Sequence, residues 1–140
     1  MNVKKLIFAG TAGSVVYFFL GYLTYGILFK ESMMSPVAGV DRNPEEMIWW
    51  SLVAGNFAFG FLLAYIIGKG GDKSILAGAT TGAVVGFLLC SGMDLIMHAT
   101  TNLITQNMLV QDVLIATVTF AIIGAVIAAV WGMGDKSQTA

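Results

Sequence analysis

Residues 75–97, ILAGATTGAVVGFLLCSGMDLIM, are almost entirely apolar and contain a single charged side chain, Asp94. About 20 helical residues, at 1.5 Å each, cross a hydrocarbon core of roughly 30 Å. Inside lipid, each backbone N–H and C=O group of such a segment must find its hydrogen bond within the segment itself, which requires a helix. Residues 75–97 are therefore predicted to form a transmembrane helix.

Three further apolar stretches have the same character and cover residues 6–29, 47–68 and 113–131. The chain is 57% hydrophobic and 11% charged, whereas soluble domains average roughly 45–50% and 25%. The four stretches leave few of the 140 residues for a soluble unit. We predict a single integral membrane domain over residues 1–140, an all-α bundle of four transmembrane helices in contact with the lipid bilayer.

Basic residues are distributed unequally between the two sides of such a bundle. The side with both termini and the middle loop carries five and the other side two: Lys4, Lys5, Lys69, Lys73 and Lys136 against Lys30 and Arg42. Cytoplasmic loops carry the excess of Lys and Arg. We therefore predict a multi-pass membrane protein with both termini in the cytoplasm. The net charge of -1 argues against nucleic-acid binding.

The cysteine and histidine content limits cofactor chemistry. Cys90 is the only cysteine, so the chain has no internal disulfide and no CxxC motif for redox chemistry or zinc. His98 is the only histidine, which excludes a haem held by two histidines. We predict no cofactor.

Small residues recur at every fourth position of the third predicted helix. The pattern GxxxGxxxG is formed by Gly78, Gly82 and Gly86. Gly124 is a similar small residue on the fourth predicted helix. This spacing lets two helix backbones approach closely within a membrane. The pattern predicts close helix packing, either inside the bundle or between copies of the chain in a homo-oligomer.

The two halves of the chain also resemble each other. With a shift of 69 residues, TAGSVVYFFL from Thr11 aligns with TTGAVVGFLL from Thr80. Two duplicated helical hairpins would be related by a pseudo-twofold axis along the membrane normal. A chance match between apolar segments is the alternative interpretation.

Polar residues cluster where the third predicted helix ends. Asp94 and His98 lie four residues apart and hence on one helical face, where they can share a charge-assisted hydrogen bond. Asn102 continues this face, and Asp112 begins the fourth predicted helix on the same side of the membrane. The group is either a structural seal or a site for a proton or cation. No metal site is predicted, because zinc sites have three or four ligands at closer spacing.

A further polar candidate lies within the second predicted helix. The motif NPEE, residues 43–46, is typical of a helix start with Asn43 as the cap. Asn56 then falls near mid-membrane, where an unpaired amide is costly. We predict that Asn56 forms a hydrogen bond across helices, with a tyrosine of the first helix as its partner.

The segments MDLIMHATTN, residues 93–102, and VQDVLIATV, residues 110–118, resemble small four-helix bacterial inner-membrane proteins grouped as a domain of unknown function. In those proteins an Asp-Leu pair at the end of one span precedes a Thr/Asn-rich stretch, and another aspartate heads the last span. The resemblance covers residues 91–118. It implies a location in the bacterial cytoplasmic (inner) membrane and marks Asp94, Asn102 and Asp112 as candidate site residues. It implies no particular activity.

Two functional interpretations follow. The first is a non-enzymatic membrane protein that self-associates or serves as an accessory subunit beside other membrane subunits. The second is a small carrier or channel in which Asp94 and His98 bind a proton, a cation or a small solute and Asn56 lines the path. No catalytic residue is predicted, because the polar face offers no nucleophile beside a base. An enzyme is therefore the least favoured interpretation.

Overall fold

The computed structural model describes residues 2–136, and within them the chain is helical and has no strand. Its elements are α1 (Val3–Gly21), the π-helical η1 (Tyr22–Leu28), the short η2 (Pro44–Glu46), α2 (Trp49–Lys69), α3 (Ile75–Thr100) and α4 (Gln106–Lys136). Four helices in this part of the chain are long and apolar enough to span a membrane: Val3–Leu28, Trp49–Lys69, Ile75–Thr100 and Gln106–Met133. The predicted all-α bundle of four membrane-spanning helices is confirmed, and the hairpin duplication stays a prediction.

Two helix starts differ from the prediction. Asn43 makes no side-chain cap and precedes only the short η2, so α2 begins later, at Trp49. In contrast α4 begins early, at Gln106, because the Thr105 hydroxyl accepts a hydrogen bond from the Met108 amide at 3.3 Å. Asp112 therefore does not begin the fourth helix but lies nearly two turns inside it.

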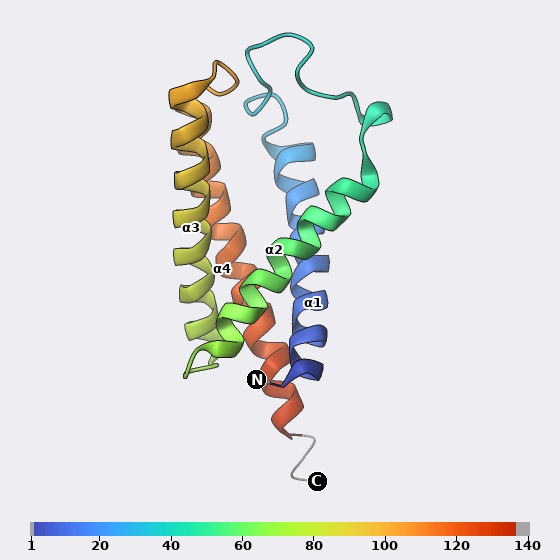
Figure 1. Cartoon of the computed structure of the whole chain (residues 1–140), viewed down its shortest axis with the longest axis vertical. Helices are drawn as coiled ribbons and strands as arrows, with labels where there is room; N and C mark the ends of the chain where they lie inside the picture. The colour runs from blue at the N-terminus through green and yellow to red at the C-terminus, as the bar shows by residue number, and fades with distance from the viewer. Residues whose placement is uncertain (1, 137–140) are drawn as a thin grey trace.

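The helices run up and down, so the start of α1 and the end of α4 lie at one end of the bundle (Figure 1). The turn between α2 and α3 lies at that same end, where the Ser74 hydroxyl caps α3 by accepting a hydrogen bond from the Ala77 amide at 3.2 Å. The long loop between η1 and α2 and the short loop between α3 and α4 lie at the other end. We call this other end the loop end.

The main hydrophobic core lies between α1, α2 and α4. Its buried members are Ala9, Leu63, Ala64, Ile67, Phe120, Ile123, Ile127 and Trp131. The rings of Tyr17 and Phe59 pack edge to face against each other and against the ring of Phe120, with centroids 5.2–6.0 Å apart. The interior of the bundle is thus filled by side chains between the loop end and the termini.

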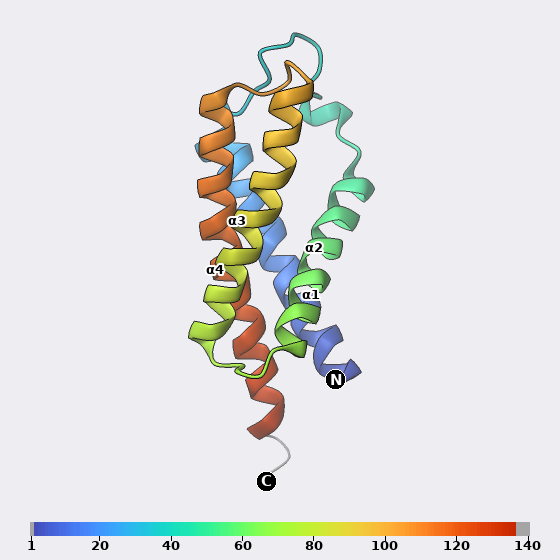
Figure 2. The ribbon, with the colours of Figure 1, turned by 60° about the vertical axis from the view of Figure 1, so that its left-hand side comes forward.

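Helices α3 and α4 lie side by side along their length (Figure 2). The contact is close because Gly78, Gly82 and Gly86 are buried against α4. A Cβ atom on Gly82 would overlap the backbone carbonyl of Phe120, and one on Gly124 would overlap the carbonyl of Gly78. Only glycine allows the two backbones to lie this close.

Helix α2 packs against the bundle over only part of its length. It crosses α1 where the buried Ser14 faces Gly60, and a Cβ atom on Gly60 would overlap the Ser14 backbone. Beyond this crossing α2 diverges from the bundle toward the loop end (Figures 1 and 2). Its first turns are therefore exposed, and Trp50 has 76% of its surface accessible.

Candidate functional site

Four polar side chains from three helical segments meet toward the loop end. The Tyr25 hydroxyl donates a hydrogen bond to Asp112 Oδ1 at 2.5 Å. The Cys90 thiol donates to Asp112 Oδ2 at 2.9 Å and also lies 3.6 Å from Asp94 Oδ2. Ligand atoms of Cys90, Asp94 and Asp112 all lie within 4.8 Å of one another. We call these four residues the carboxyl cluster.

The glycine contacts between α3 and α4 explain why Cys90 meets Asp112. Each step of four residues forward along α3 is matched by a step of four backward along α4. Gly78 lies against Gly124, Gly82 against Phe120, and Gly86 against Ala116. The next step in the same antiparallel register pairs Cys90 with Asp112, as their hydrogen bond shows. Asp94 joins them because it lies one turn after Cys90 on the same face of α3.

Tyr25 reaches the cluster from η1, the π-helical continuation of α1. Single π-helical turns are rare and frequently occur at functional sites. The Thr24 hydroxyl donates to the Leu20 carbonyl at 2.8 Å, where the α-helix changes into the π-helix. This change of helix type sets the direction in which the Tyr25 phenol points, and it points to Asp112.

Neither α3 nor α4 places a basic residue beside the two carboxyl groups of the cluster. Asp94 and Asp112 are both half-buried. The sequence has no lysine or arginine between Lys73 and Lys136, so neither α3 nor α4 provides a cation at this depth. A charge without a partner inside a membrane protein is expensive, and such residues commonly belong to ion sites. Two carboxyl groups held together here are able to bind a cation or to share a proton.

A small cavity of about 30 Å³ adjoins both carboxyl groups. Its lining consists of Met33, Asp94, Ile104, Met108, Leu109 and Asp112. This space suffices for one water molecule or a small ion. The long loop covers it, since the Ser35 hydroxyl donates to the Leu103 carbonyl at 2.9 Å and Gln111 donates to the Ser32 hydroxyl at 2.9 Å. The cavity therefore lies between the two carboxyl groups and the long loop of the loop end.

His98 and Asn102 do not join the cluster. The His98 side chain is exposed, and its Nδ1 atom lies 3.3 Å from the Ile104 carbonyl oxygen. The expected pair with Asp94 is not formed, because Asp94 turns instead toward Cys90 and Asp112. Asn102 is exposed in the loop after α3. Of the predicted polar residues near the end of α3, only Asp94 and Asp112 come together.

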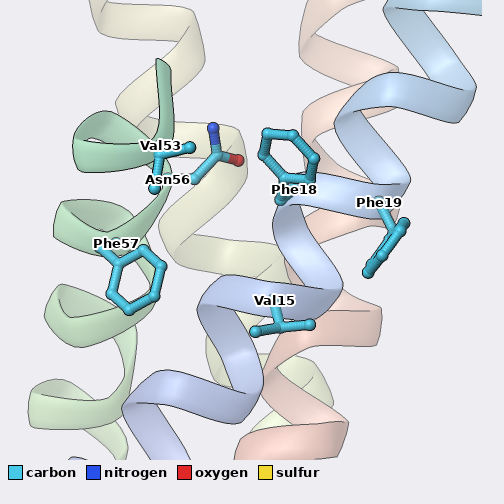
Figure 3. Close-up of a pocket in the computed structure, with 6 residues that line it drawn as sticks. All are labelled: Val15, Phe18, Phe19, Val53, Asn56 and Phe57. Atoms are coloured by element: carbon cyan, nitrogen blue, oxygen red, sulfur yellow. The ribbon is translucent and has the colours of Figure 1, made fainter. Parts of the chain in front are cut away.

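Asn56 finds a partner in its own helix instead of a tyrosine. Its side-chain amide donates to the Leu52 carbonyl at 2.7 Å. The predicted hydrogen bond across helices is wrong because α2 has already diverged from α1 at this height. Asn56 faces the resulting groove of about 220 Å³, whose other lining residues are Val15, Phe18, Phe19, Val53 and Phe57 (Figure 3).

Tyr25 and Cys90 are the two members of the cluster that the sequence analysis missed. Cys90 precedes Asp94 by four residues, the same spacing that led to His98 on the other side of it. Extending the polar periodicity toward the N-terminus would have identified the thiol. Tyr25 has no such pattern, because its position depends on the π-helical turn.

The comparisons with known proteins identify a family. No curated protein and no solved structure matches the chain. A family model described as "Protein of unknown function (DUF1761)" matches residues 9–128, a span that includes every member of the carboxyl cluster. The predicted resemblance to a domain of unknown function is thus confirmed over a longer stretch than residues 91–118. The chain, with its four helices long and apolar enough to span a membrane, therefore belongs to the DUF1761 family, whose function is unknown.

Proposed function

We propose that this membrane protein binds a metal cation at Asp94 and Asp112. The observation that supports the proposal is the meeting of two carboxyl groups, a thiol and a phenol from three helical segments, without a basic residue from α3 or α4. Carboxylate oxygens are ligands for most biological metal ions. With the termini in the cytoplasm of a bacterium, the site would be reached from the external face of the inner membrane.

The core beneath the cluster favours binding over conduction by a single chain. The rings of Tyr17, Phe59 and Phe120 lie between the helices. The buried Ile127 and Trp131 fill the region closer to the termini. A cation would therefore enter and leave through the cavity at the loop end. The proposed site therefore consists of Asp94 and Asp112 and differs from the Asp94–His98 site expected for a carrier.

Thermal unfolding of the purified full-length protein in detergent tests the proposal. At 100 times its dissociation constant a cation stabilises the folded state by about 2.7 kcal/mol. We expect at least one of Mg²⁺, Ca²⁺, Mn²⁺ and Zn²⁺ to raise the Tm of the wild type. Asp94→Asn combined with Asp112→Asn should abolish this rise.

His98→Ala is the matched control, because His98 is ionisable, close in sequence and outside the cluster. This variant should respond to the cation as the wild type does. The proposal fails if no cation shifts the Tm of the wild type, or if the double variant responds equally well.

Self-association is a second candidate function, and the exposed face of α2 favours it. Gly55 lies within this membrane-spanning helix, yet a Cβ atom there would meet no other atom within 4 Å. Ser51, Ala54 and Ala58 are exposed beside it. Small residues of this kind allow a second helix to approach closely, so we propose a second copy of the chain as the partner of this face.

Gly55→Leu tests this interface through the mass of the complex after gentle extraction from the membrane. The wild type should give a multiple of 14.8 kDa, and Gly55→Leu should give the monomer because a large side chain blocks the approach of the helices. Gly92→Leu is the control, since Gly92 also lies in a membrane-spanning helix with open space around it. A monomeric wild type contradicts the proposal, and a foreign subunit at fixed ratio would indicate an accessory chain instead.

A further inference from the structure

We infer that the carboxyl cluster is a site for a divalent transition metal of the zinc class, with Cys90, Asp94 and Asp112 as ligands and Tyr25 as the residue that orients Asp112. The inference rests on the proposed cation binding and names the class of cation. Its basis is the mixed donor set, one sulfur and two carboxylate oxygens from two helices, whose ligand atoms lie within 4.8 Å of one another beside a small cavity that both carboxyl groups line.

The spacing of the donor atoms suits a tetrahedral ion. Zinc–sulfur bonds are about 2.3 Å long and zinc–oxygen bonds about 2.0–2.2 Å, which places sulfur and oxygen ligands about 3.5 Å apart. Cys90 Sγ lies 2.9 Å from Asp112 Oδ2 and 3.6 Å from Asp94 Oδ2. These two separations are near the tetrahedral value, and the third, between the carboxylates of Asp94 and Asp112, lies within 4.8 Å.

The thiol decides the class of metal. Mg²⁺ and Ca²⁺ prefer oxygen ligands alone, whereas thiolate ligands favour softer transition metals such as zinc. When the metal binds, a metal–sulfur bond replaces the Cys90 S–H bond, and the thiol proton leaves to water. The cavity of about 30 Å³ beside both carboxyl groups has room for one water molecule as the fourth ligand.

Asp112 uses its two oxygens for different partners, which is typical of a carboxylate held ready for a metal. Tyr25 donates to Oδ1, while Oδ2 faces Cys90. Partners that hydrogen-bond a ligating carboxylate fix its orientation, and their loss commonly lowers metal affinity about 10–100-fold. Tyr25 is therefore a positioning residue that leaves Oδ2 free for the metal.

Titration of the purified full-length protein with Co²⁺ tests the site by its absorption spectrum. Co²⁺ occupies tetrahedral zinc sites, and a thiolate ligand gives it a sulfur-to-cobalt charge-transfer band. We expect this band in the wild type, its removal by Zn²⁺ and its persistence in excess Mg²⁺. Cys90→Ser should lack the band, and Tyr25→Phe should keep the band with an affinity about 10–100-fold lower. His98→Ala should match the wild type.

The outcomes separate this inference from the proposed function. If Mg²⁺, Ca²⁺ or Mn²⁺ stabilises the wild type and Cys90→Ser equally and Co²⁺ gives no charge-transfer band, the cation site stands and the zinc-class assignment is overturned. If no cation binds, both fall. A band that survives in the Asp94→Asn, Asp112→Asn double variant would place the metal elsewhere and overturn the assigned ligand set.

Discussion

Asp112→Asn is expected to lower zinc affinity by at least about 100-fold, more than the roughly 10–100-fold that follows the loss of a partner beside a ligand. Asp112 is the central residue of the cluster, because it contacts both Tyr25 and Cys90. The amide keeps the shape of the side chain but removes its negative charge. Calorimetric titration with Zn²⁺ would measure the effect, and circular dichroism would show that the helices remain.

A graded series makes this prediction specific. Tyr25→Phe should give an intermediate affinity, because it removes only the hydrogen bond that orients Asp112. Tyr22→Phe is its control, since it removes the same hydroxyl from another tyrosine of η1 that is 59% exposed and lies outside the cluster. An Asp112→Asn protein that binds Zn²⁺ as tightly as Tyr25→Phe would show that Asp112 is not a ligand.

Gly82→Leu is expected to have the largest effect on stability. Even the first carbon of the new side chain would overlap the Phe120 carbonyl, which belongs to the backbone of α4 and cannot rotate away. Overpacking of a buried site costs about 1–3 kcal/mol when side chains can adjust. We expect a cost at or above the upper end of this range, measured as a lower Tm in detergent, because here the helices themselves must separate.

Gly92→Leu is the control for this change, because it adds the same side chain to the same helix where nothing lies within 4 Å of the new Cβ atom. Its Tm should stay close to that of the wild type. Gly82→Leu should also lose zinc binding, since separation of α3 from α4 withdraws Cys90 from Asp112. Equal Tm values for the two variants would show that the close backbone contact does not stabilise the protein.

The fold could be predicted from the sequence because a membrane makes strong demands on each helix separately. Residues 75–97 had to be long, apolar and helical to cross the bilayer, whatever their neighbours. The start of α4 was harder to predict. Residues 106–112 include polar side chains such as Gln106 and Asn107, so the hydropathy pattern placed the beginning of the helix too late.

The site could be predicted only in part, because its geometry depends on the register between two helices. Asp94 and Asp112 stand out as charges in apolar surroundings. That Asp112 meets Cys90 follows from the pairing of Gly82 with Phe120, which no pattern within a single helix reveals. His98 and Cys90 each lie four residues from Asp94, one after it and one before it. Sequence spacing therefore could not show which of the two side chains Asp94 contacts, and the tertiary structure shows that it is Cys90.

The close contact of α3 with α4 has a mechanical consequence. Because these two helices are in backbone contact over several turns, we expect them to move as one unit, with relative motion concentrated at the junction of this pair with α1. Near the cluster this junction includes the Tyr25–Asp112 hydrogen bond. An ion bound to Asp112 would hold this junction in a fixed geometry. Occupancy of the small metal site would therefore control how far the α3–α4 pair moves relative to α1.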